Sequence, residues 1–174
     1  TGAGGADTIT GGAGVDTITG GAGNDTINVL LTQDGNTDVM TGAGGTDTLN
    51  LSGASHTFDD DGNLATIEAI TLADDGTTLT LTGQTEAFTI TTANGTNTVV
   101  GSAGANTITG GTAVDTITGG AGDDTIKVAL LNDGNTDVMT GGDGTDTLHL
   151  TGVTHTFATD GNLATIEAIT LATD

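Results

Sequence analysis

Aspartates recur at one place in a short pattern: each follows a glycine-rich stretch and precedes a threonine and an aliphatic residue. Near the start of the chain, Asp7, Asp16 and Asp25 stand nine residues apart. A carboxylate offers negative charge and hard oxygen donors, so a regular file of such groups favours the binding of a hard divalent cation. Without a cation, carboxylates stacked about 4.8 Å apart would repel by about 3 to 4 kcal/mol at an effective dielectric near 20.

The composition narrows the possible partners of these carboxylates. The chain has 174 residues and a formal net charge of −22, with one Lys or Arg residue in total, 31 glycines and no cysteine. Nucleic acids and anionic membranes are not expected as partners, because the basic side chains that neutralise phosphates are missing. Thiolate metal sites and disulfides are excluded. No apolar run approaches the roughly 20 residues of a transmembrane helix, so we expect no transmembrane segment.

Two nested periods organise the chain. Residues 11–75 align without a gap on residues 110–174, which gives a long period of 99 residues. We expect a first unit at 1–99, with cation-binding coils at about 2–50 and metal-free coils at about 51–99. Residues 100–174 then form a second, incomplete unit, and the chain is expected to be a window from a longer tandem array.

The short period of nine residues predicts strands. In the segment Asp16–Thr19, alternation places Ile18 inward and the two threonines outward. Glycine is too frequent for a helix, and Thr-Ile-Thr triplets favour strands. Each nine-residue coil is a turn followed by a short strand, and two coils make one full wrap. The expected fold class is therefore all-β, a parallel β-solenoid with stacked aliphatic residues inside.

The nine-residue coils predict which aspartates share a side of the solenoid. Alternate coils should lie on the same side, which groups Asp7 with Asp25 and Asp47, Asp16 with Asp38, Asp115 with Asp137, and Asp124 with Asp146. Because 99 is eleven times nine, each unit should contain an odd number of coils. This parity predicts that equivalent residues of the two units lie on opposite faces. In the metal-free coils, the aspartate position should hold Ala65, Ile70, Leu79 and Phe88.

The nonapeptides GGAGVDTIT at residues 11–19 and GGAGNDTIN at residues 20–28 resemble the RTX (haemolysin-type) glycine-rich calcium-binding repeat, G-G-x-G-x-D-x-U-x, where U is a large aliphatic residue. Variants begin at residues 2, 42, 110, 119 and 141. The resemblance implies a parallel β-roll that binds several Ca²⁺ ions between stacked turns. The implied side-chain ligands are Asp7, Asp16, Asp25, Asp38, Asp47, Asp115, Asp124, Asp137 and Asp146. The implied carbonyl ligands lie around Gly2, Gly4, Gly11, Gly14, Gly20, Gly23, Gly42, Gly45, Gly119, Gly122, Gly141 and Gly144.

The repeated motif DGNTD contains oxygen-bearing side chains at alternate positions, which resembles the start of other calcium loops. It predicts an additional site formed by Asp34, Asn36 and Asp38, and again by Asp133, Asn135 and Asp137. The alternative interpretation is a polar turn.

Other polar residues depart from the repeat. Asn97 and Asn106 occupy the aspartate position, where we expect stacked, hydrogen-bonded amides in place of calcium. His56 and His155 are placed in the same position as surface or stacking residues. Glu68 and Glu167 are interpreted as outward strand residues.

No catalytic motif nominates a nucleophile with its base, so we expect no enzyme activity in this chain. The leading hypothesis is a calcium-binding structural β-roll repeat of a large protein of the surface layer, an adhesin stalk or an extracellular filament. The resemblance implies a secreted, extracellular or cell-surface location in a Gram-negative bacterium, and neighbouring repeats or self-association as partners. Two alternatives remain: a calcium-dependent folding and secretion appendage of a type I-secreted exoenzyme, and an ice-binding module with Thr-x-Thr ladders.

Overall fold

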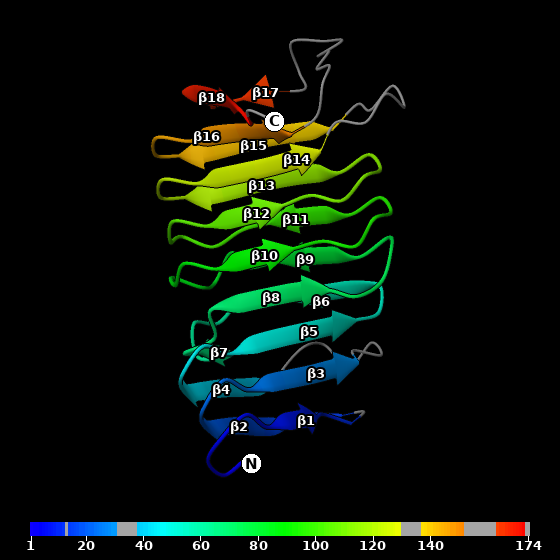
Figure 1. The fold of residues 1–174 in the computed structure, drawn as a ribbon, viewed down its shortest axis with the longest axis vertical. Helices are drawn as coiled ribbons and strands as arrows, with labels where there is room; N and C mark the ends of the chain where they lie inside the picture. Colours follow the sequence, from blue (N-terminus) through cyan, green and yellow to red (C-terminus); the bar gives the residue numbers. More distant parts are fainter. Residues whose placement is uncertain (13, 31–37, 130–136, 152–162, 173–174) are drawn as a thin grey trace.

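The computed structural model describes residues 1–12, 14–30, 38–129, 137–151 and 163–172. These residues form strands, turns and bends without a helix, so the expected all-β fold is confirmed. Accordingly, the described part of the chain contains no helix that is long and apolar enough to cross a lipid bilayer. The strands wind into a parallel β-solenoid, and its coils stack along one axis (Figure 1).

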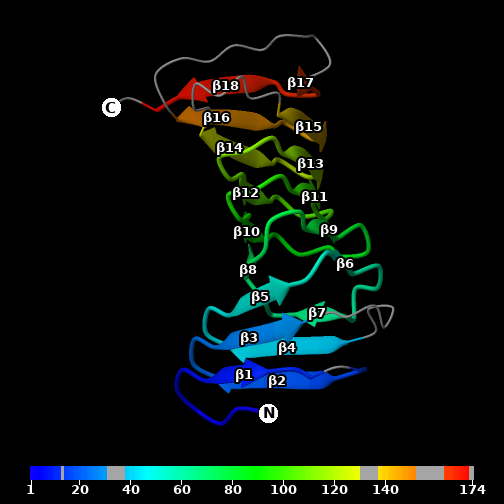
Figure 2. The same ribbon diagram turned by 90° about the vertical axis from the view of Figure 1, so that its right-hand side faces the viewer.

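One sheet runs the whole length of the stack, and every pairing in it is parallel. Its nine strands are, in order, β1 (Thr8–Thr10), β3 (Thr26–Leu30), β5 (Thr48–Ser52), β8 (Ala69–Leu72), β10 (Thr89–Thr91), β12 (Thr107–Thr109), β14 (Thr125–Ala129), β16 (Thr147–Thr151) and β18 (Ala168–Leu171). The opposite side is divided into two shorter sheets, and Figure 2 shows the two sides facing each other.

The three-stranded sheet contains β2 (Thr17–Ala22), β4 (Val39–Gly44) and β7 (Leu64–Ala65). The six-stranded sheet contains β6 (Ser55–Thr57), β9 (Thr78–Thr80), β11 (Thr98–Val100), β13 (Thr116–Ala121), β15 (Val138–Asp143) and β17 (Leu163–Ala164). The chain alternates between the long sheet and one of these two sheets, except between β5 and β8, where it forms β6 and then β7 on the opposite side. Two strands therefore complete a wrap, as the sequence predicts, except in the wrap that contains β6 and β7.

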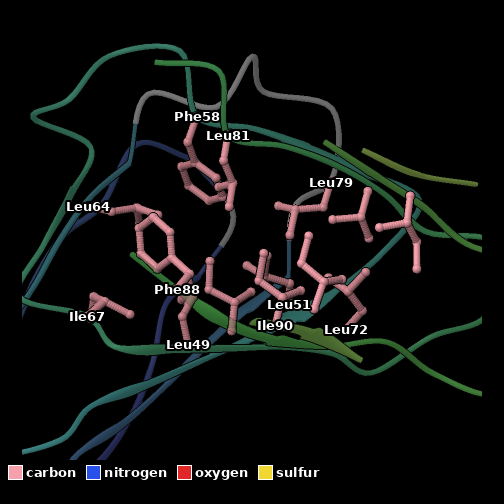
Figure 3. Packing of buried hydrophobic residues seen from close by; sticks show 14 of the residues in the cluster. Leu49, Leu51, Phe58, Leu64, Ile67, Leu72, Leu79, Leu81, Phe88 and Ile90 are labelled. Atoms are coloured by element: carbon pink, nitrogen blue, oxygen red, sulfur yellow. The ribbon is translucent and has the colours of Figure 1, made fainter. Parts of the chain in front are cut away.

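Inward aliphatic side chains form the narrow core between the sheets. In β3, Ile27 and Val29 are buried while Thr26 and Asn28 are partly exposed, which is the predicted alternation. Within the first unit, Phe58 and Phe88 lie among leucines in the core (Figure 3). His56 also points inward there: it is fully buried in β6 and pairs in register with Leu79. The prediction of a surface or stacking histidine is wrong at His56, and His155 lies outside the described residues.

The predicted parity of the repeat is wrong. Register partners along the long sheet from Ile27 to Ile126 are separated by 22, 21, 20, 18 and 18 residues, so 99 residues make five complete wraps. Ten half-wraps are an even number, and equivalent residues therefore lie on the same side. Asp25 and Asp124, for example, both precede strands of the long sheet. Three of the five wraps have longer corners and therefore contain more than 18 residues. For this reason, eleven periods of nine residues correspond to ten half-wraps and not to eleven.

The same longer corners shift the predicted register in the middle of the unit. Ile70 and Leu79 are buried at strand centres, paired with Leu49 and Val99, and do not occupy the aspartate position. Glu68 and Thr77 directly precede those strands and therefore occupy the aspartate position there. Ala65 lies within β7 and does not hold the position either. Phe88, which precedes β10, occupies the position as predicted.

Candidate metal centre

The aspartates of the repeat form hydrogen-bonded ladders along the corners of the solenoid. On the side of the long sheet, the Asp7 N–H donates to Asp25 Oδ1 at 2.8 Å and the Asp25 N–H donates to Asp47 Oδ1 at 2.7 Å. On the other side, the Asp16 N–H donates to Asp38 Oδ1 at 2.8 Å. The ladders confirm the grouping of aspartates that the sequence predicts within the first unit. Each such bond to a charged acceptor fixes the orientation of one carboxylate between two coils.

The second unit repeats the arrangement. The Asp115 N–H donates to Asp137 Oδ1 and the Asp124 N–H donates to Asp146 Oδ1, each at 2.8 Å. These four aspartates are buried, with exposed fractions of 0 to 3%. Buried carboxylates aligned in this way repel each other, since a buried charge requires a compensating one.

The second carboxylate oxygen distinguishes two kinds of turn. In what we term closed turns, Oδ2 accepts a hydrogen bond from the second residue of its own glycine-rich stretch: Ala3 N–H to Asp7, Gly12 N–H to Asp16 and Gly111 N–H to Asp115, at 2.8 to 2.9 Å. In open turns, Oδ2 is buried and has no hydrogen-bond partner among the described residues. The open turns are those of Asp25, Asp47, Asp124 and Asp146.

A backbone difference accompanies the two kinds of turn. The second residue of each open turn has a positive φ: 119° at Gly21, 82° at Ala43, 126° at Gly120 and 122° at Gly142. In the closed turns the corresponding residues do not adopt this conformation. The long strands β2, β4, β13 and β15 continue into the open turns, where Gly21 pairs with Ala43 and Gly120 with Gly142. The second residue thus takes part in pairing between coils, and Oδ2 remains an acceptor without a donor.

Backbone carbonyls converge on the unpartnered oxygens. A Cβ added at Gly20 would lie 2.4 Å from Asp25 Oδ2 and 2.7 Å from the Gly42 carbonyl oxygen. A Cβ at Gly42 would overlap both Asp47 Oδ2 and the Thr66 carbonyl oxygen. Gly119 and Gly141 have the equivalent neighbours in the second unit. Only glycine can leave this space between hard oxygen donors open, and hard oxygen donors are the ligands that calcium prefers.

Side chains alone do not assemble a metal site. Across the described ranges, no three His, Cys, Asp or Glu side chains converge closely enough to hold an ion. A cation at an open turn would therefore need backbone carbonyls for many of its ligands. The pKa of Asp124 is raised to about 6, because burial and the charges of Asp146 and Asp123 outweigh the hydrogen bonds from Asn106, with burial as the largest cause. Burial likewise raises the pKa of Asp115. The carboxylates at these corners lack sufficient positive charge around them.

Asparagine replaces the missing charge with amide donors. Asn106 is buried, its Oδ1 accepts from the Phe88 N–H at 3.0 Å, and its Nδ2 donates to the carbonyls of Gly104 at 2.7 Å and Gly119 at 3.4 Å. Asn97 Nδ2 similarly donates to the carbonyls of Ala93 and Gly95, at 3.0 and 2.5 Å. The hydrogen-bonded amides predicted at these positions are confirmed. Carbonyls that would face a cation at an open turn face an N–H here.

Two glutamates belong to the ladders on the side of the long sheet and were not predicted from the sequence as part of them. Glu68 and Glu167 directly precede β8 and β18. Glu68 continues the ladder of Asp25 and Asp47, and Glu167 continues that of Asp124 and Asp146. Glu68 is exposed, as expected of an outward residue, but it lies just before β8 and not within a strand, and its Oε2 accepts from the Asp47 N–H at 2.7 Å. The sequence signal that could have identified these glutamates is the similarity of Glu-Ala-Ile-Thr to the Asp-Thr-Ile-Thr of the repeat. Asp34, Asn36, Asp133 and Asn135 lie outside the described residues, so the expected additional site is not described.

Four copies of the RTX calcium-binding nonapeptide repeat match residues 1–31, 91–126 and 133–151. The chain carries RTX repeats. The matched segments include the turns of Asp25, Asp124 and Asp146, so three of the four open turns fall within calcium-binding repeats. Neither the curated proteins nor the solved structures gave a match to the chain.

Proposed function

We propose that this RTX β-roll is a calcium-dependent structural segment of a large secreted or cell-surface protein. The observation that carries the proposal is the set of four buried Oδ2 atoms without hydrogen-bond partners, each beside a neighbouring backbone carbonyl oxygen. An unpartnered buried carboxylate oxygen is costly, and a calcium ion between such oxygens turns repulsion into attraction. The first ligands are Asp25, Asp47, Asp124 and Asp146, with the carbonyls of Gly42 and Gly141.

The closed turns belong to the same proposal as a second group. Asp7, Asp16 and Asp115 direct Oδ2 to an N–H of their own turn, and calcium binding there requires that peptide to rotate toward the conformation of the open turns. Asp38 and Asp137 complete the ladders that contain Asp16 and Asp115. We expect calcium to fill the open turns first and the closed turns at higher concentration.

The structural role follows from the architecture and the charge. Each wrap contacts mainly its neighbours, so tandem units extend as a rod whose stability depends on the interfaces between wraps. A net charge of −22 opposes compaction, and calcium binding coupled to folding supplies the missing stability. An extracellular surface layer, adhesin stalk or filament would encounter calcium at the concentration that permits folding. A folding and secretion appendage of an exoenzyme is the alternative context.

Threonine columns on the long sheet bear on the ice-binding alternative. The column through Thr89, Thr107 and Thr125 is regular, but the neighbouring column contains Asn28, Asn50, Lys127 and His149. A flat lattice of hydroxyls is interrupted there, so the structural role is preferred. An ice-recrystallisation assay should show no inhibition by the folded protein.

A calcium titration followed by circular dichroism tests the proposal. The expected result is a cooperative gain of β signal at micromolar to millimolar calcium, with magnesium as the control that does not produce it. Isothermal titration calorimetry should show calcium binding over the same range. A complete β spectrum in chelator, together with no calcium heat, would contradict the proposal.

A further inference from the structure

Glu68 and Glu167 take the last position of each acidic ladder on the side of the long sheet. The Asp25 N–H donates to Asp47 Oδ1 at 2.7 Å, and the Asp47 N–H donates to Glu68 Oε2 at the same distance. In the second unit the Asp146 N–H donates to Glu167 Oε2 at 2.7 Å. Each glutamate therefore accepts a hydrogen bond from the N–H of the aspartate one wrap earlier, as that aspartate does from the aspartate of the wrap before it.

The backbone near each glutamate supplies a carbonyl at the position of the glycine carbonyls. Thr66 lies beside Gly42, and a Cβ at Gly42 would overlap the Thr66 carbonyl oxygen as well as Asp47 Oδ2. Thr165 has the same relation to Gly141 and Asp146. Thr66 and Thr165 have positive φ values of 50° and 48°, which non-glycine residues seldom adopt.

Hydrogen bonds hold both threonines in this strained conformation. Thr66 Oγ1 accepts from the Ala43 N–H at 2.7 Å, and Thr165 Oγ1 accepts from the Gly142 N–H at 2.8 Å. Ala43 and Gly142 are the positive-φ residues in the open turns of Asp47 and Asp146. These bonds therefore join the two backbone segments that flank the space beside Oδ2 of each aspartate. The same strained backbone occurs twice, at positions 99 residues apart.

The longer glutamate side chain suits a shorter corner. Four residues separate Gly42 from Asp47, whereas only Ile67 separates Thr66 from Glu68, and Ile67 is anchored in the core (Figure 3). The N–H groups of Glu68 and Ala69 both donate to the Asp47 carbonyl, at 3.2 and 3.1 Å. The chain thus turns more tightly, and the additional methylene of glutamate allows its carboxylate to reach the Asp47 N–H.

We propose that Glu68 and the Thr66 carbonyl complete a terminal calcium site with Asp47, and that Glu167 and the Thr165 carbonyl do so with Asp146. This inference rests on the proposed calcium-dependent function. Neither glutamate lies in the segments that match the RTX repeat, and its turn contains no glycine. Two carboxylates balance one divalent ion, and Asp47 Oδ2 is a buried oxygen without a hydrogen-bond partner at this site. The ladder ends here because the next position holds Phe88.

Glu68→Gln in the full chain is the first test variant. Its amide oxygen can still accept from the Asp47 N–H, so the change removes charge and keeps the shape. Titration with calcium chloride by calorimetry should show the loss of one calcium equivalent, or a drop of about tenfold or more in the affinity of one site, since ligand charge sets calcium affinity. Glu86→Gln is the matched control, because Glu86 lies in a turn between Gln84 and Phe88 that contains no aspartate.

A double-mutant comparison separates a shared site from a general charge effect. Asp47→Asn should lose the same calcium, and adding Glu68→Gln to it should cause no further loss. Equal calcium number and affinity in Glu68→Gln and Glu86→Gln would overturn the inference while wild-type binding keeps the proposed function. Absence of calcium binding by the wild type would overturn the proposed function itself. If Glu68→Gln does not fold in calcium, Glu167→Gln gives the same test in the second unit.

Discussion

The turns of Asn106 and Asp124 follow each other on one side of the solenoid and fill the same position with different groups. Asn106 presents Nδ2 to the Gly119 carbonyl at 3.4 Å, whereas Asp124 presents an unpartnered oxygen near the Gly141 carbonyl. The amide carries its own donors, so its corner is satisfied by the protein alone. The carboxylate corner needs a cation for the same purpose. The same backbone arrangement therefore carries a region satisfied by its own amides and a region that we propose to depend on calcium.

The metal-independent region should respond to loss of its apolar core. We expect Phe88→Ala to lower the free energy of unfolding by about 3 to 5 kcal/mol, because a buried aromatic ring is removed from the core. The loss should be the same in calcium and in chelator, as measured by denaturant unfolding. Val15→Ala is the control, since Val15 is 68% exposed. A loss restored by calcium would show that the two regions are not separate.

The open turn should not tolerate a side chain at its first glycine. Gly42→Ala places a methyl group against Asp47 Oδ2 and the Thr66 carbonyl, and we expect a loss of about 3 kcal/mol in calcium, at the upper end of overpacking costs. Thermal unfolding with saturating calcium measures it. Gly62→Ala is the matched control, because Gly62 lies outside the open and closed turns and a Cβ there meets only Asp60 Oδ1, at 3.4 Å. Similar stability of the two variants would argue against a tightly packed cation site.

Converting an asparagine turn into an acidic turn should make its stability depend on calcium. Asn106→Asp removes the donors to Gly104 and Gly119 and places a carboxylate beside Asp124 Oδ1, which Asn106 Nδ2 now contacts at 3.2 Å. We expect a loss of about 2 to 3 kcal/mol in chelator, with part of it recovered in calcium. Chemical unfolding under both conditions checks this. Asn94→Asp, at an exposed position, provides the same charge change as a control.

The reverse exchange should have a smaller effect of opposite sign. Asp25→Asn supplies an amide near the Gly42 carbonyl, and we expect a gain of about 1 kcal/mol in chelator, typical of one net hydrogen bond. The stabilisation by calcium should decrease at the same time. Asp59→Asn at an exposed position serves as the control. A loss of stability in chelator would mean that the carboxylate is already satisfied in the metal-free fold.

The weakest effect that we expect is a dependence on pH. The pKa of Asp124 is raised from its ordinary value of 3.8 to about 6, chiefly by burial, so the protonated form is favoured by the metal-free fold. This contribution to stability in chelator is present below about pH 4 and is lost as the pH rises through about 6. Calcium requires the ionised group, so its affinity should fall as the pH drops below about 6. Calcium titrations from about pH 5 to about pH 8 would measure this shift.

The sequence by itself determined the main architecture. Alternation in Thr-Ile-Thr sets which side chains face the core, and the glycine-rich turn before each aspartate sets where the carboxylates stack, since both depend only on local backbone preferences. The grouping of Asp25 with Asp47, and of Asp124 with Asp146, followed from two strands per wrap. The RTX family was also evident from adjoining nonapeptides.

The tertiary structure decided the number of wraps per unit, the place of the glutamates and the state of each carboxylate. Corner length is set by packing, so Ile67 can replace a four-residue glycine turn and shift the register without disturbing the strand pattern. Whether Oδ2 meets an N–H depends on the φ of the second turn residue: Gly12 bonds Asp16, whereas Gly21 pairs with the next coil. Both are the second glycine of a Gly-Gly-Ala-Gly stretch. Only the hydrogen bonds between coils distinguish them, and such bonds exist only after the chain has wound into a solenoid.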